Sequence, residues 1–264
     1  MRILAPDEPN PVLVSNADGT SPFFIACDHA GRVVPRSLGT LGLPVHEYDC
    51  HIAYDIGAWG VSLLLSEALN APAIGQLYSR LVIDCNRSPG VPTSIVEVSE
   101  LTPIPGNVGL SPADRDARAR EIFWPYQNRI QALLNARASR PTVLIAMHSF
   151  TPSFKDASRP WHAGVLFNRD DRFARIVLEL LRREPGLVVG ENEPYAVSDL
   201  TDYTVPVHAE KRGLPHVELE IRQDLISDES GQRQWAEIFT RLLPEARRLF
   251  LARHSGESRN PLVL

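Results

Sequence analysis

Short apolar runs, each bounded by polar residues, Gly or Pro, recur along the whole chain. Their content of β-branched and aromatic residues is typical of strands. Several of them end directly at a charged residue or a histidine. The predicted strands are Phe23 to Cys27, Arg80 to Cys85, Thr142 to Met147, Ala163 to Phe167, Leu187 to Gly190 and His216 to Ile221.

Between these runs, apolar residues recur at spacings of three and four, which predicts amphipathic helices. Ser111 is placed to cap one helix, with Pro112 in its first turn, and Pro185 followed by Gly186 ends another. The apolar positions that define the helices are Phe123, Tyr126, Ile130, Leu133 and Leu134; Phe173, Ile176, Val177, Leu180 and Leu181; and Trp235, Ile238, Phe239, Leu242 and Leu243, with a further helix over Ala58 to Leu69.

Strands that alternate with helices predict the α/β class, because each strand needs apolar cover on both faces of the sheet. We therefore expect a three-layer sandwich with a mixed, mostly parallel sheet and helices on both faces. The chain has 264 residues and no linker-like stretch divides it, so we expect a single domain over residues 1–252. Residues 253–264 are polar and predict a C-terminal tail.

Composition narrows the functional class. A net charge of −5 argues against a general nucleic-acid binder, which needs a concentrated basic surface, and favours a small-molecule substrate. We find neither a signal-peptide pattern nor an apolar run of membrane-spanning length, so a cytoplasmic protein without membrane association is expected. Cys27, Cys50 and Cys85 form no CxxC pair, which favours reduced thiols that serve as packing residues.

Candidate chemistry gathers at predicted strand ends, where open α/β sheets place their ligands. Asp28 and His29 follow the first run and His148 follows the third, while Glu218 and Glu220 share one face of the last. Two histidines and a carboxylate, with one position left for water, form a catalytic zinc site, and a further carboxylate can move the proton. The structural alternative is a pair of hydrogen-bonded histidines and an ion pair of Glu220 with Arg222 or another arginine.

Two further segments carry polar groups. In the first, Asp49, His51 and Asp55 precede an apolar helix, so they can act as helix caps or as a ligand with its supporting residues. In the second, Asn86 and Arg87 are suited to binding a substrate carboxylate, although a structural salt bridge would use the same residues.

Together these motifs resemble the N-formylglutamate amidohydrolase family from about Asp28 to about Ile226. The segments that carry the resemblance, in chain order, are DHAGRVVP, DCHIAYDIGA, SRLVIDCNR, MHSF, GENEPY and HAEKRGLPHVELEIRQDLI. The resemblance implies a metal-dependent hydrolase that converts N-formyl-L-glutamate and water to L-glutamate and formate, an activity of histidine degradation, or that cuts another N-acyl amino acid. It also implies a fold like that of zinc exopeptidases.

Residue by residue, the resemblance implies His29 and His148 as zinc ligands and Glu220 as general base. We add His208 as a second catalytic candidate, an electrophile or acid, with a surface helix residue as the alternative. It also implies a carboxylate-binding role for Asn86 and Arg87, and we add Arg222 to these substrate-binding candidates. Zinc carboxypeptidases have a Glu three residues after the first ligand, where this chain has Arg32, so the third ligand must come from elsewhere. Asp49 is our choice, and Asp28, His51 and Asp84 remain alternatives.

Two rival functions stay open. One is a carboxypeptidase-like or cell-wall peptide amidase that shares the metal site, against which the lack of an export signal counts. The other is a non-catalytic ligand-binding relative with the same fold. Metal content together with formate release distinguishes them from the amidohydrolase, and the oligomeric state cannot be deduced from the sequence.

Overall fold

The computed structural model describes residues 2–254, and its centre is a seven-stranded sheet in the order β1-β3-β2-β6-β11-β9-β10. The four strands β3, β2, β6 and β11 run parallel to one another. The edge strand β1 is antiparallel to β3, while β9 is antiparallel to β11 and parallel to β10. The strands are β1 (Val12–Ser15), β2 (Phe23–Cys27), β3 (Ala73–Gln76), β6 (Val143–Phe150), β9 (Ala163–Leu166), β10 (Val189–Glu191) and β11 (His216–Arg222).

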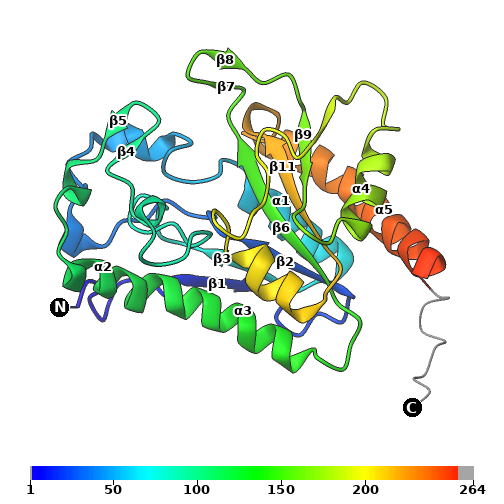
Figure 1. Ribbon diagram of the computed structural model, residues 1–264, viewed down its shortest axis with the longest axis horizontal. Helices are drawn as coiled ribbons and strands as arrows, with labels where there is room; N and C mark the ends of the chain where they lie inside the picture. Colours follow the sequence, from blue (N-terminus) through cyan, green and yellow to red (C-terminus); the bar gives the residue numbers. More distant parts are fainter. Residues whose placement is uncertain (1, 255–264) are drawn as a thin grey trace.

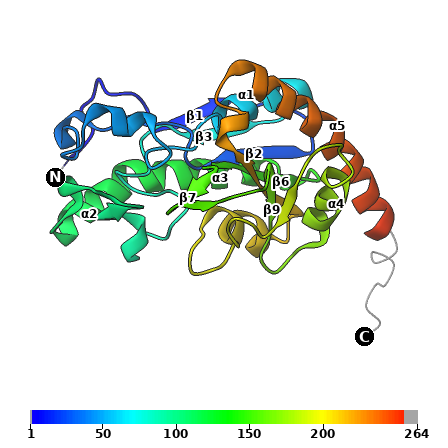
Figure 2. The ribbon, with the colours of Figure 1, turned by 90° about the horizontal axis from the view of Figure 1, so that it is seen from above.

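Helices cover both faces of this sheet, which completes the predicted three-layer sandwich (Figures 1 and 2). One face carries α1 (Ala58–Leu69), α4 (Arg172–Leu181) and α5 (Glu229–His254). The other carries α2 (Pro112–Arg118), a π-helical turn over Ala119–Phe123, α3 (Trp124–Ala136) and a second π-helical turn over Val205–Ala209. Short 3-10 turns lie at Arg36–Leu38, Val45–Asp49, Pro92–Ser94, Pro105–Asn107, Glu210–Arg212 and Gln223–Leu225.

Two small hairpins stand apart from the main sheet. They are β4 (Val98–Ser99) with β5 (Thr102–Pro103), and β7 (Ser153–Phe154) with β8 (Ala157–Ser158). The β7–β8 hairpin follows β6 directly, so it rises beyond the carboxyl end of that central strand (Figure 1).

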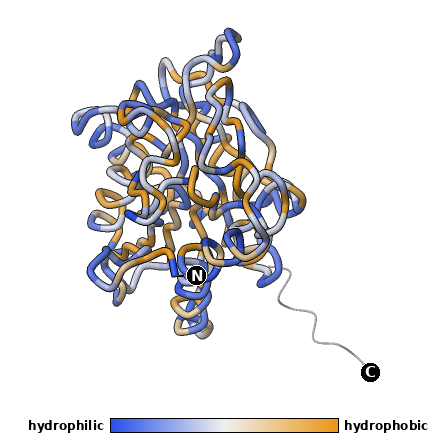
Figure 3. Tube along the Cα trace, turned by 90° about the vertical axis from the view of Figure 1, so that its left-hand side faces the viewer, coloured by the Kyte–Doolittle hydropathy of each residue, from blue (hydrophilic) through white to orange (hydrophobic). Residues whose placement is uncertain are grey.

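The two faces of the sheet form two separate cores because side chains alternate along each strand. In β2, Phe23, Ile25 and Cys27 pack with the helices α1, α4 and α5, whereas Phe24 and Ala26 pack with α3 and its neighbours. All five residues of β2 are buried, as expected for a central strand covered on both sides. Apolar segments accordingly run through the middle of the molecule in Figure 3.

Most predicted elements are present. The runs at Phe23 and His216 begin their strands at the predicted residue, and the capping box at Ser111 holds the start of α2 through the Asp114 backbone and side chain. The last helix is longer than its apolar pattern indicated and includes His254, which the prediction had placed in the tail. The rest of the predicted tail, residues 255–264, lies outside the described part of the chain.

The predicted strand Arg80 to Cys85 is wrong, since this segment forms turns, and the strands β1 and β3 were not predicted. The apolar run is buried, but side chains rather than a neighbouring strand satisfy its carbonyl groups. Asn107 donates to the Leu81 carbonyl, Arg118 to that of Val82, and Gln127 to that of Cys85. Burial alone therefore did not distinguish a strand from a loop supported by side chains.

Among the described residues, no helix combines the length and the apolar character that crossing a membrane requires.

Candidate functional site

The register of the central strands aligns three polar side chains, those of Asp28, His148 and Glu220. Ala26 of β2 pairs with Ala146 of β6, so Asp28, two residues further on, is level with His148. His148 in turn pairs with Glu220 of β11. Because the strands are parallel neighbours, this row lies at their carboxyl ends, and Glu218 lies one step deeper on the same face.

A fourth carboxylate reaches the row from the loop before α1. Asp55 hydrogen-bonds through its backbone N–H to the His29 carbonyl, 3.0 Å away, which ties this loop to the end of β2. Gly57 then turns the chain into α1 with a φ of +79°, and a Cβ there would lie 2.1 Å from the Ile226 carbonyl oxygen. The loop can therefore follow this path only with glycine at that position.

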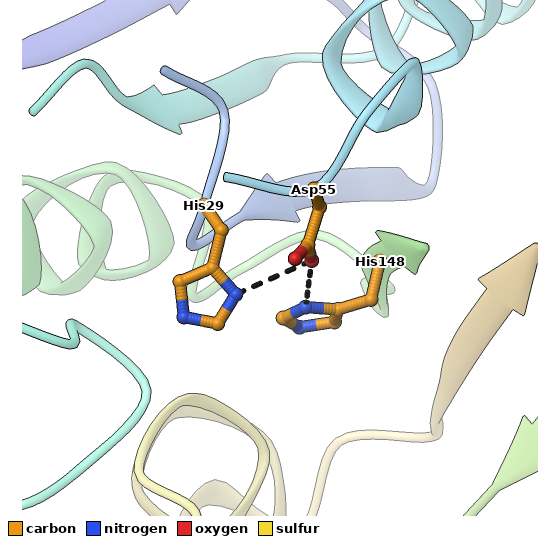
Figure 4. Close-up of side chains that lie close together, drawn as sticks. All are labelled: His29, Asp55 and His148. Atoms are coloured by element: carbon orange, nitrogen blue, oxygen red, sulfur yellow. Dashed lines mark hydrogen bonds and ion pairs between the residues drawn. The ribbon is translucent and has the colours of Figure 1, made fainter. Parts of the chain in front are cut away.

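Asp55 joins the two histidines (Figure 4). Its Oδ2 lies 3.2 Å from His29 Nδ1 and 2.8 Å from His148 Nδ1. The opposite ring nitrogens also face carboxylates, since His29 Nε2 lies 2.8 Å from Asp84 and His148 Nε2 lies 3.4 Å from Asp28. Each imidazole is thus held between two acidic groups, and all five side chains are buried.

These residues fit a divalent metal ion. The three groups that offer ligand atoms are His29, Asp55 and His148, whose donor atoms lie within 4.8 Å of one another. Donors around a tetrahedral zinc ion with bonds of about 2.0–2.2 Å lie about 3.3 Å apart, close to the two separations from Asp55. If the Nδ1 atoms bind the ion, each Nε2–H is free to donate to its own carboxylate, an arrangement that fixes the tautomer and orientation of metal-bound histidines.

The charge of the cluster supports the same conclusion. Asp28, Asp55 and Asp84 are buried carboxylates, and Arg80 is the cation that pairs with two of them, at 3.2 Å from Asp55 and 2.8 Å from Asp84. With both imidazoles neutral, the group carries two uncompensated negative charges. Either two imidazole protons or one divalent cation would neutralise them.

The pKa shifts reflect this balance. Burial opposes ionisation of Asp55, but the charges and hydrogen bonds of the two histidines outweigh it and hold its pKa below the usual value. For His148, burial favours the neutral ring, yet hydrogen bonds to Asp28 and Asp55 raise its pKa well above normal. The ring nitrogens therefore attract positive charge strongly.

A pocket of about 170 Å³ opens onto this cluster and includes Glu218 and Glu220 in its wall. Burial raises the pKa of both glutamates to about 8, and one carboxyl oxygen of each has no hydrogen-bond partner. Arg222 does not pair with Glu220 but with Asp224, at 2.8 Å, so the expected alternative of an ion pair between Glu220 and Arg222 is absent. Glu220 is instead a buried acid beside the two histidines.

Other predicted site residues lie elsewhere. The structure does not bring Asp49 to the histidines; it is exposed and pairs with Arg32 at the surface. His208 is buried in the π-helical turn, where its Nε2 contacts Gln127 at 2.7 Å, and it is absent from the pocket wall. Arg222 likewise lies outside that wall.

Asn86 and Arg87 do line the pocket, but both already have partners. Asn86 donates to Asp202 and accepts from the backbone N–H groups of Tyr203 and Thr204. Arg87 pairs with the same Asp202 at 3.0 Å.

Sequence reasoning missed the central position of Asp55 and the role of Arg80, and it did not foresee that Tyr195 enters the pocket. For Asp55 a signal was present, because it stands immediately before Ile56 and a glycine that opens a helix, but Asp49 and His51 in the same segment were equally suitable. For Arg80 and Tyr195 the sequence carries no comparable signal.

Known proteins resemble this chain in sequence and in fold. The sequence model of N-formylglutamate amidohydrolases matches residues 21–227. A solved gene product of Agrobacterium tumefaciens is 36% identical, with a TM-score of 0.90 over 94% of this chain and 98% of its own. N-formylglutamate amidohydrolase from Ralstonia eutropha shares the fold at 16% identity, with a TM-score of 0.67 over 91% of this chain and 99% of its own.

No functionally curated protein matches the chain. The family match nevertheless spans the segment that contains the histidines, Asp55 and both pocket glutamates. The chain therefore belongs to the N-formylglutamate amidohydrolase family.

Proposed function

We propose that this protein is a zinc-dependent amidohydrolase that cleaves the N-formyl or N-acyl amide of an acidic amino acid, with N-formyl-L-glutamate as the reference substrate. The observation that carries the proposal is the buried His29, Asp55 and His148 cluster beside the unpaired acid Glu220. Membership of the family supports hydrolysis of an amide.

In this proposal His29 and His148 would hold the metal through the Nδ1 atoms that face Asp55, and Asp55 would hold it through a carboxylate oxygen. Asp84 and Asp28 would orient the two rings by facing the Nε2 atoms of His29 and His148, respectively. A zinc ion at this position would supply a Lewis acid that polarises the amide carbonyl and makes water more acidic.

Glu220 is proposed to take a proton from the attacking water and return it to the departing nitrogen. The residue is placed for this because it is level with His148 and one of its oxygens is free. Burial raises its pKa, while the positive charges of His148, Arg80 and Arg159 oppose that effect. With a pKa of about 8 the carboxyl is largely protonated near neutral pH, and a divalent cation held by the neighbouring histidines would add positive charge that favours the ionised form a proton acceptor must have.

Arg80 is proposed to stabilise the negative charge that develops on the carbonyl oxygen. It lines the pocket, and Asp55 and Asp84 fix its guanidinium next to the histidines. A cation held in place by the fold needs no rearrangement during the reaction.

Two neighbouring pockets give the site room for a small substrate. A second pocket of about 260 Å³ adjoins the first and shares His51, Arg80, Arg87 and Tyr195 with it. Together they offer room for an amino-acid side chain next to the reacting amide.

The test is formate release by zinc-loaded protein from N-formyl-L-glutamate, with chelator-treated protein and an unformylated dipeptide as controls. We expect metal-dependent release of formate and no dipeptide cleavage. Dipeptide cleavage without formate release would favour the peptidase alternative. Failure to cleave any formyl or acyl amino acid despite stoichiometric zinc would contradict the proposal and favour a binding protein.

A further inference from the structure

The arginines around the site differ in one respect, which is whether a carboxylate neutralises them. Arg80 pairs with Asp55 and Asp84, and Arg87 pairs with Asp202. Arg159 is also buried, at 8% exposure, yet the described residues place no carboxylate oxygen within ion-pair distance of it. A buried cation without a counter-charge is costly, and an anionic ligand would relieve that cost.

Arg159 follows the β7–β8 hairpin, which rises from the end of the strand that carries His148 (Figure 1). Its backbone N–H donates to the Pro152 carbonyl at 2.9 Å, which anchors the residue at the base of the hairpin. Its guanidinium makes a long hydrogen bond, 3.5 Å to the Thr151 carbonyl oxygen, and a further one to the Tyr195 side chain. A guanidinium has five N–H donors, more than these two contacts use.

Aromatic rings hold the guanidinium in place. Its central carbon lies 4.8 Å from the ring centres of Phe154 and Tyr195, and 6.0 Å from that of Phe150. Such stacking orients the planar group while leaving its edge free to donate hydrogen bonds. The side chain is therefore fixed before any ligand arrives.

The same rings form the walls of the site. Phe150 and Tyr195 line the pocket that contains the histidines, and Phe154 and Tyr195 line the adjoining pocket. Arg159 itself lines neither pocket, but it lies behind these rings, and its positive charge lowers the pKa of Glu220 and Tyr195.

We propose that Arg159, stacked between Phe154 and Tyr195, is the residue that binds a carboxylate of the substrate. The proposal rests on the proposed function for the statement that this carboxylate belongs to an N-acyl amino acid. It assigns recognition to a residue outside the Asn86 and Arg87 pair, because the amide of Asn86 is engaged by Asp202 and the neighbouring backbone and the charge of Arg87 is already paired with Asp202. A carboxylate matches the paired N–H donors of a guanidinium edge.

The experiment measures binding of three ligands to zinc-loaded protein by titration calorimetry, alongside formate release. The ligands are N-formyl-L-glutamate and its two monoamides, one with the side-chain carboxylate and one with the α-carboxylate replaced. We expect wild-type protein to bind N-formyl-L-glutamate at least about 10-fold more tightly than one of the monoamides, since hydrogen bonds to charged groups contribute on that scale. That monoamide identifies the carboxylate bound by Arg159.

In Arg159→Met this discrimination should disappear, while the affinity for the identified monoamide stays within about 3-fold of wild type, because the lost partner is already absent from that ligand. Arg241→Met, which removes a surface arginine paired with Glu184, is the matched control and should leave all three affinities unchanged. If Arg159→Met does not fold, Arg159→Lys keeps the positive charge but lacks the paired N–H donors of the guanidinium. It should therefore show a smaller loss of discrimination between the ligands.

Equal weakening of all three ligands, unchanged discrimination, or no binding of any ligand by wild-type protein would overturn the assignment of Arg159. Selective binding that depends on Arg159, without formate release, would uphold the assignment and reject the proposed hydrolysis instead. The two proposals can therefore fail separately.

Discussion

Glu218 and Glu220 are chemically similar but differently placed, which allows a matched comparison at the scale of single residues. Both are buried on one face of β11, and burial raises the pKa of each to about 8. Only Glu220 is level with His148 in the register of the sheet. The account therefore assigns proton transfer to Glu220 alone.

Glu220→Gln should retain zinc and ligand binding but lose at least about 100-fold in turnover, the lower end of what a positioned proton-transfer group supplies. Glu218→Gln should retain zinc and keep its turnover within about 10-fold of wild type, because it removes a neighbouring acid that does not reach the reacting atoms. Zinc content, melting temperature and formate release should be measured on the same preparations. A larger loss in Glu218→Gln than in Glu220→Gln would transfer the role to Glu218.

His208 illustrates a different outcome for a buried titratable group. Its ring lies 2.7 Å from Gln127, and burial lowers its pKa to about 4, so it is neutral in the folded protein near pH 7. In the unfolded chain its pKa is about 6.5. Between these values the unfolded state binds a proton that the folded state does not.

The free energy of unfolding should therefore fall as the pH decreases from about 6.5 to about 4, with His208 contributing up to about 1.4 kcal/mol per pH unit. Above pH 6.5 His208 should contribute no pH dependence. Urea unfolding of wild type and His208→Gln across this range measures the effect, and the variant should show a shallower dependence. Parallel curves for the two proteins would show that His208 is not responsible.

At the scale of elements, the start of α1 positions the candidate ligand Asp55. Gly57 has a φ of +79° and faces the Ile226 carbonyl, so an added Cβ would clash at 2.1 Å. Gly186, after α4, has nearly the same φ of +78° but nothing within 4 Å of the position of its Cβ. The two glycines share the backbone conformation and differ in their surroundings.

Gly186→Ala should cost only the left-handed conformation, about 1–2 kcal/mol in the free energy of unfolding. Gly57→Ala should cost more than that and should also lower zinc occupancy, because relief of the clash moves the loop that carries Asp55. Chemical denaturation and metal analysis of both variants test this. Equal destabilisation with full zinc in both would mean that the Asp55 loop tolerates the change.

The elements also show what a sequence can and cannot predict here. Strands such as β2 and β6 were identifiable because their apolar runs are flanked by polar residues and are buried on both faces. The segment Arg80 to Cys85 has a similar run, but Asn107, Arg118 and Gln127 satisfy its carbonyls from distant positions. Such partners are 26 to 42 residues away, beyond what a local pattern conveys.

The same limit applies to the site. His29, His148 and Glu220 lie at the ends of strands, so the parallel sheet brings them together from sequence information alone. Asp55 and Arg159 lie on loops, and their positions depend on long-range contacts with the ends of β2 and β6. Sequence therefore predicted that these strand-borne residues meet, whereas the structure brings Asp55 rather than Asp49 of the same segment to the histidines.

At the scale of the whole molecule, the two faces of the sheet differ: one packs against helices, and the other carries the candidate catalytic residues. Helices α1, α4 and α5 pack a largely apolar core against one face of the sheet. The opposite face carries Asp28, His148, Glu218 and Glu220 toward the layer of α3 and the π-helical turns. A buried cluster with an excess of negative charge is stable in such a layer only with compensating cations.

The most direct test of the central claim is a crystal of the zinc-loaded protein with anomalous diffraction measured on both sides of the zinc absorption edge. The account predicts one strong anomalous peak bound by His29 Nδ1, His148 Nδ1 and a carboxylate oxygen of Asp55, adjacent to Glu220. A peak bound by Asp49 or His51 in place of Asp55, or stoichiometric zinc located away from the two histidines, would contradict it.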